Sequence, residues 1–118
     1  MVTIDMVSRL ARALPEVEEH DHWGHPAFRV GKQMFAVVWP KERIVILKLA
    51  PPEQSALLSS DPYTFTADQW VDQSEEGEGW TKILLKGVTA GDFEQHLELA
   101  WRGVATKSAL KAHEEKRP

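Results

Sequence analysis

The stretch from residue 27 to residue 49 constrains this chain most, because its pattern is typical of short strands joined by tight turns. β-Branched and aromatic residues fill residues 27–30, 33–39 and 44–49, with Gly31-Lys32 and residues 40–43 between them. Such side chains fit the pleated, half-buried surface of a sheet, whereas glycine, proline and polar residues mark turns. The pattern predicts a three-stranded antiparallel meander around which the other elements pack.

Amphipathic helices are predicted on both sides of this meander. Thr3 can cap a first helix in which apolar residues recur at three- and four-residue spacing up to Leu14. Thr89 can cap a last long helix with an apolar stripe from Phe93 to Val104. We therefore predict an α+β fold, a two-layer sandwich whose N- and C-terminal helices cover one face of an antiparallel sheet. We expect the other face to meet solvent.

Shorter segments complete the predicted fold. A helix is expected to open at Pro51-Pro52 and to end near residue 60, followed by a weak strand at 63–66. Alternation predicts another strand at 80–86, and polar composition predicts connecting loops at 16–25 and 68–79, the second of them acidic. A length of 118 residues suits one domain. We assign residues 1–110 to it and residues 111–118 to a basic C-terminal tail.

Several function classes are excluded or disfavoured by composition. The chain has no cysteine, so disulfides, thiolate nucleophiles and cysteine-based zinc sites are absent. The longest apolar run, Met34 to Trp39, is far too short to span a bilayer, and no signal-peptide pattern opens the chain. No glycine-rich phosphate loop, Gly-x-Ser-x-Gly or His-Glu-x-x-His motif occurs. We expect a cytoplasmic, non-enzymatic protein without membrane contact or cofactor.

Four segments in a fixed order resemble the MmcQ/YjbR family. They are Leu-Pro-Glu-Val-Glu-Glu at 14–19, Trp-Gly-His-Pro-Ala-Phe-Arg-Val-Gly-Lys-Gln-Met-Phe-Ala at 23–36, Gly-Trp at 79–80 and Leu-Ala-Trp-Arg at 99–102. The resemblance covers roughly residues 5 to 110. It implies a fold similar to the CyaY/frataxin-like α+β sandwich and a DNA-binding function, and it brings no catalytic residue with it.

A set of basic residues supplies the candidate nucleic-acid site. Alternation along 80–86 puts Lys82 and Lys86 on the face of Trp80, and Lys48 has the parity of the outward side of its own strand. Lysines supply sequence-independent phosphate contacts, and an exposed tryptophan offers a stacking platform for bases. The predicted nucleic-acid-binding residues are Lys48, Lys82, Lys86, Arg29, Arg43 and Trp80.

Other interpretations of the same residues stay open. Lysines on an outward sheet face can serve only to keep it soluble, and the net charge of −4 disfavours a general phosphate binder. The alternative function is a protein-interaction or small-ligand-binding module with Trp39, Trp70 or Trp80 in an exposed patch. No particular protein partner is predicted.

Metal binding is a weaker option. Imidazoles and carboxylates suit zinc, nickel or copper, and His20, His22 and His25 lie close together in the sequence. Their spacing matches no known ligand frame, so we predict a solvated loop whose Trp23 tucks into the core, and no metal site. The frataxin-like fold that the resemblance implies also suggests an iron site on the first helix. We reject that site, because Arg9 and Arg12 accompany the single carboxylate of this helix, Asp5.

Overall fold

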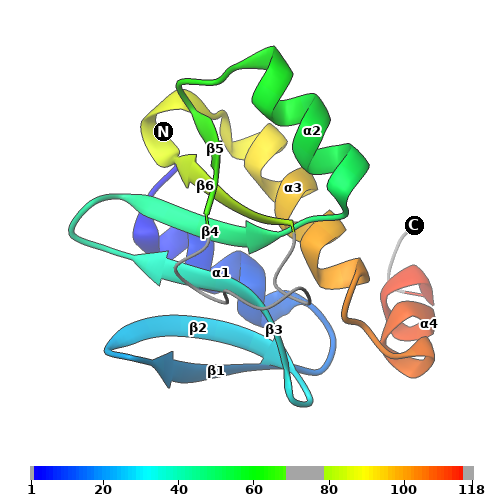
Figure 1. Ribbon diagram of the computed structural model, residues 1–118. Coiled ribbons are helices and arrows are strands. Elements are labelled where there is room, and N and C mark those ends of the chain that lie inside the picture. The colour runs from blue at the N-terminus through cyan, green and yellow to red at the C-terminus, as the bar shows by residue number, and fades with distance from the viewer. Residues whose placement is uncertain (1, 69–78, 116–118) are drawn as a thin grey trace.

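A six-stranded antiparallel sheet in the order β1-β2-β3-β4-β6-β5 forms one layer of the molecule (Figure 1). The computed structural model describes residues 2–68 and 79–115 of the chain. Every neighbouring pair of strands in this sheet is antiparallel. The strands are β1 (Val17–His22), β2 (His25–Val30), β3 (Gln33–Trp39), β4 (Ile44–Lys48), β5 (Phe65–Ala67) and β6 (Trp80–Leu84).

Helices form the second layer, and the predicted α+β sandwich is confirmed. The helices are α1 (Ile4–Ala13), α2 (Pro51–Ser60), α3 (Ala90–Arg102) and α4 (Lys107–Glu115), with a short 3₁₀ turn, η2 (Leu85–Gly87). Figure 1 shows α1 and α3 behind the sheet, α2 beside β5, and α4 after α3. The face of the sheet opposite α1 and α3 therefore points toward the viewer, and we call it the second face.

The helix starts follow from their capping residues. The Thr3 hydroxyl accepts a hydrogen bond from the Met6 amide at 3.1 Å, and Asp5 lies in the first turn of α1. The Thr89 hydroxyl accepts from the Asp92 amide at 3.1 Å at the start of α3. Each hydroxyl satisfies an amide that has no partner within its helix, and each carboxylate lies near the positive end of a helix dipole.

The main core lies between the sheet and the helices. Trp101 of α3 is its largest fully buried side chain, and its Nε1 donates to the Pro15 carbonyl at 3.1 Å. This bond satisfies the indole donor and ties α3 to the residues that follow α1. The cluster also contains Phe28, Phe35, Val45, Leu47, Ile83, Phe93 and Leu97.

The second face is not simply open to solvent, and that expectation was wrong. A separate buried cluster occupies its centre. The central strands carry β-branched and aromatic residues not only at the positions that face the helices but also at those that face the other side. Its fully or almost fully buried members are Ala27, Val37, Ile46 and Trp80. Partly buried Met34, Trp39 and Ile44 pack against them.

An irregularity in the pairing of β2 with β3 distributes the residues between the two clusters. Phe28 pairs with Ala36, whereas the next residue, Arg29, pairs with Met34. Phe35 is therefore an extra residue on β3, as in a β-bulge. Phe35 and Ala36 both belong to the helix-facing cluster, and Met34 packs on the second face.

Other differences from the predicted elements are local. The predicted polar loop at 16–25 contains β1 and the start of β2, because an edge strand tolerates a polar sequence. The strand predicted at 63–66 covers 65–67, and the one predicted at 80–86 ends at Leu84 before η2. The predicted boundary at 110/111 falls inside α4, where Ala109 is buried. Most of the predicted acidic loop, residues 69–78, lies outside the described residues.

Candidate nucleic-acid interface

The pairing of β4 with β6 places two lysines on the second face. Lys48 lies opposite Trp80, and Lys82 lies opposite Ile46, with Val45, Leu47 and Ile83 on the helix-facing side. Both lysine side chains are partly exposed. Within residues 2–68 and 79–115, neither lysine forms an ion pair. Their charges therefore lie near a common buried patch without a carboxylate from the described residues to neutralise them.

Trp80 is buried on the same face as Lys48 and Lys82. The indole is only 3% exposed, so the exposed stacking platform expected at this position was wrong. Lys48 Nζ lies 6.0 Å from the Trp80 ring centroid, at the outer limit of a cation–π contact. The Trp80 carbonyl accepts a hydrogen bond from Gln54 Nε2 at 3.0 Å, which links the strand to α2. The alternation of side chains along a strand predicts the face on which a residue lies, but it does not predict how deeply that residue is buried.

Lys86 does not lie on the strand pair beside Lys48 and Lys82. The strand ends at Leu84, and Lys86 lies in η2, so the strand alternation that grouped it with Lys82 does not reach it. Its ammonium instead lies 5.5 Å from the Tyr63 ring centroid, and both side chains are exposed. Lys86 is therefore an exposed cation beyond the end of β6.

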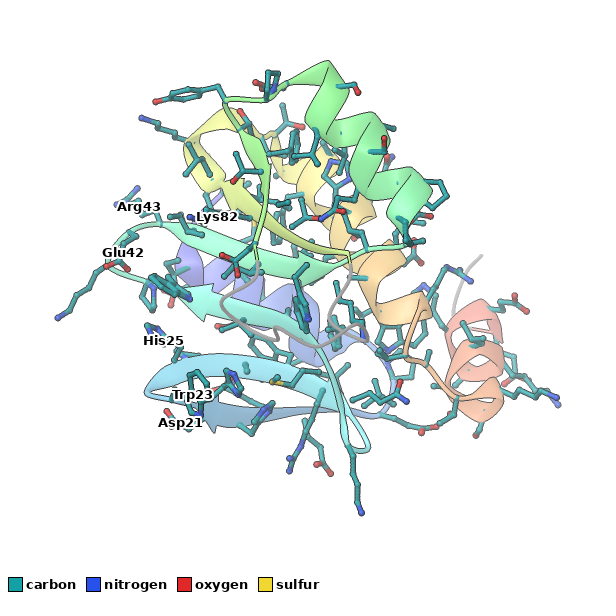
Figure 2. The ribbon with its side chains drawn as sticks, in the orientation of Figure 1. Asp21, Trp23, His25, Glu42, Arg43 and Lys82 are labelled. Carbon is teal, nitrogen blue, oxygen red and sulfur yellow. The ribbon has the colours of Figure 1, made fainter. Side chains whose placement is uncertain are left out.

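The two arginines occupy different places. Arg29 shares the second face, but its Nε lies 3.6 Å from a carboxylate oxygen of Glu18, and both side chains are partly exposed. Arg43 is exposed in the turn between β3 and β4, where its backbone has φ 55° and its carbonyl accepts from the Leu85 amide at 3.1 Å. Figure 2 shows Arg43 at one end of the sheet with Glu42 next to it, whereas Lys82 lies in the middle of β6.

Flat aromatic and imidazole rings gather at the same end of the sheet, on and beside the β1–β2 hairpin (Figure 2). His22 and Trp23 stack with ring centroids 5.1 Å apart, and His25 stacks on Trp39 at 4.6 Å. Trp23 is 72% exposed, so the prediction that it tucks into the core was wrong. The hairpin signal in the sequence, a Trp-Gly pair between two histidines, could have placed it at a turn.

The hairpin histidines share one face of the β1–β2 pair. His22 pairs with His25 across the two strands, and His20 lies on the same face of β1. Burial, Arg29 and His22 together lower the pKa of His20, with a smaller opposing effect of Asp21. Among the described residues, no group of three or more potential ligands is arranged to hold a metal ion.

The predicted tryptophan patch is only partly on the surface. Trp39 is half-buried against His25, Trp80 is buried, and Trp70 lies outside the described residues. Among the described tryptophans, Trp23 is the strongly exposed one, although the sequence had assigned it to the core. None of the helices in residues 2–68 and 79–115 combines the length and hydrophobicity that a bilayer crossing requires.

Comparison with known proteins gives a family and a fold. A family model described as YjbR matches residues 12–103. The crystal structure of Deinococcus radiodurans protein DR2400, with the family-model domain DUF419, is similar to the chain at 21% sequence identity and a TM-score of 0.76. The match covers 95% of this chain and 88% of that one. No curated protein matches this chain.

Proposed function

The chain belongs to the YjbR family, and we propose that it is a non-enzymatic protein that binds DNA through the second face of its sheet. One observation carries the proposal: the β4–β6 register sets Lys48 and Lys82 on a single face, free of ion pairs among the described residues. Ammonium groups so placed contact phosphates by releasing condensed counterions, which requires no particular base sequence.

The local charge of this region differs from that of the whole chain. The net charge is −4 overall, yet residues 27–50 hold five basic residues against Glu42 alone. Arg43 and Lys86 extend the cationic side chains beyond the strand pair, and Arg29 contributes its charge while sharing it with Glu18. Because phosphate contacts depend on local potential, an acidic protein can bind DNA at such a patch, with modest affinity and strong sensitivity to salt.

The first test is fluorescence anisotropy of labelled single- and double-stranded DNA at about 50 and about 200 mM salt. A surface that contacts several phosphates predicts micromolar binding that weakens at least about tenfold at the higher salt. Absence of binding at the lower salt for both DNA forms would overturn the proposal. Binding that does not respond to salt would instead favour an interaction surface based on aromatic rings.

The second test assigns the binding to the second face. The Lys48→Glu/Lys82→Glu double variant is expected to lose DNA binding by more than about tenfold at the lower salt. The matched control, Lys107→Glu/Lys111→Glu, changes the net charge equally on exposed positions of α4 and should keep most of the affinity. Equal losses in both double variants would show that only net charge matters. The melting temperature of the Lys48→Glu/Lys82→Glu variant, compared with that of the wild type, checks that the loss does not come from unfolding.

A further inference from the structure

The tip of the β1–β2 hairpin holds a strongly exposed tryptophan. Trp23 and Gly24 form its two-residue turn, with φ of 51° and 85°, and His22 pairs with His25 to close it. Two successive positive φ values define a type I′ turn, in which asparagine, aspartate or glycine is favoured at the first position. A bulky aromatic residue in this conformation is a marked outlier.

Burial does not explain the tryptophan either. Its side chain is 72% exposed, the highest value among the large apolar side chains of the described residues. The turn is secured by the side chain of Asp21, whose Oδ2 accepts a hydrogen bond from the Gly24 amide at 3.0 Å. The indole therefore adds little to the core and is not what closes the turn. An unfavourable backbone that presents a large side chain to water points to a role in binding.

The surroundings of Trp23 identify the chemistry of the ligand. The His22 ring stacks on the indole with an interplanar angle of 11°, which holds it in a defined orientation. Arg43 lies toward the same end of the sheet as Trp23 (Figure 2), and Lys82 lies in the middle of β6 on the second face. A flat ring held in one orientation, at the end of a sheet that also carries cations, suits a ligand that has both flat rings and negative charges. Single-stranded nucleic acid has this combination, because its bases are free to stack on aromatic side chains while its phosphates contact cations.

We propose that Trp23 is a base-stacking residue and that the preferred ligand of the second face is single-stranded DNA. This inference rests on the proposed DNA-binding function and makes it specific. In a duplex the bases are stacked on one another and their faces are covered, so a surface indole reaches them only if a base is flipped out. On a single strand, one base stacks on Trp23 while neighbouring phosphates approach the cations of the second face.

The key variant is Trp23→Asn, because asparagine suits the type I′ turn and removes the indole. Its melting temperature is expected to stay the same or to rise, while affinity for single-stranded DNA falls by about tenfold. Trp23→Phe keeps an aromatic ring and should retain most of that affinity. Leu99→Ala is the control, since Leu99 is also an exposed large apolar side chain but lies on α3 behind the sheet. It should leave single-strand binding almost unchanged.

Measuring all four proteins with single-stranded, duplex and single-stranded RNA probes separates the outcomes. A preference for single-stranded DNA that disappears in Trp23→Asn supports the inference. Binding of both DNA forms that Trp23→Asn leaves unchanged would overturn it while leaving the proposed DNA binding intact. Tighter binding of the RNA probe, with the same loss in Trp23→Asn, would overturn DNA as the preferred ligand. Binding of no probe at low salt would remove the proposed function itself.

Discussion

The two faces of the sheet differ most clearly at two consecutive residues of β4. Ile46 and Leu47 are both fully buried, yet Leu47 belongs to the helix-facing cluster and Ile46 to the cluster of the second face. Apolar side chains of the helices surround the first cluster. The second is small, and Lys48, Lys82 and Arg29 lie around it on the same face. One face therefore stabilises the fold, and the other combines a rigid apolar centre with a charged border.

This difference in burial has a consequence for how the two faces contribute to stability and to binding. On a fully solvated face, few neighbouring side chains would restrict the aliphatic part of each lysine side chain. Here the buried Trp80 lies beside the Lys48 side chain, and the charged ends of the partly exposed lysines reach solvent. The helix-facing side is covered by α1 and α3, so its packing contributes to stability. Substitutions on the two faces should therefore separate stability from binding.

The largest effect is expected from Trp101→Ala on the helix-facing side. The substitution removes the largest fully buried side chain and the donor to the Pro15 carbonyl. The free energy of unfolding should fall by about 3–5 kcal/mol in urea denaturation. Trp101→Phe, which keeps most of the volume, should lose clearly less. A loss below about 1 kcal/mol for the alanine variant would contradict the assignment of the main core to this face.

A smaller loss of stability is expected from Ile46→Ala on the second face. The free energy of unfolding should fall by about 2–3 kcal/mol, since partly buried neighbours such as Met34 and Ile44 can close part of the cavity. Leu47→Ala is the control on the opposite face and should lose more. DNA affinity should fall only in the Ile46 variant, because its side chain supports Lys82 across the strands. Equal changes in both variants would erase the proposed difference between the faces.

Glu18→Gln should sharpen the role of the second face with almost no change in stability. The ion pair between Glu18 and Arg29 is partly exposed, so its loss changes the free energy of unfolding by less than about 0.5 kcal/mol. Arg29 then contributes its full charge, and DNA should bind about twofold to threefold more tightly, with a steeper salt dependence. Glu94→Gln, at an exposed position of α3, makes the same charge change away from this face. An equal gain in that control would contradict a localised interface.

The smallest expected effect is a dependence of stability on pH. Burial lowers the pKa of half-buried His96, which contacts Phe65 edge to face, and only Asp92 opposes this shift. Below the ordinary pKa of 6.5 the unfolded chain binds a proton that the folded chain does not. Stability should therefore decline as the pH falls below that value, until the lower folded pKa is passed. The lowered pKa of His20 acts in the same direction.

Urea denaturation between about pH 7.5 and pH 5 measures this slope. A His96→Gln variant should flatten it, because glutamine does not titrate, and should leave DNA affinity unchanged, since His96 lies on α3. A free energy of unfolding of the wild type that rises as the pH falls through this range would contradict the prediction. A full slope in His96→Gln would assign the effect to His20 on the second face instead.

Local patterns predicted most of the fold, because hydrophobic periodicity and caps act within a few residues. Thr3 and Thr89 cap the helices as predicted, and strand alternation placed Lys48 and Lys82 on one face. The polar edge strand β1 escaped prediction, since pairing on one side requires no hydrophobic pattern. The depth of Trp80 and the exposure of Trp23 also escaped, because both depend on what other segments cover. The sequence suggested an exposed Trp80 and a buried Trp23, and the structure has the reverse.

The most direct test of the central claim is a two-dimensional ¹H–¹⁵N NMR titration with a short single-stranded DNA. If the second face holds the ligand, the backbone amides of Lys48 and Lys82 and the indole N–H of Trp23 should shift in parallel as DNA is added. The indole N–H of Trp101 and the amides of α1 and α3 should stay in place, because they lie in or behind the helix-facing core. Shifts confined to the helices, or no shifts at low salt, would contradict the proposed interface.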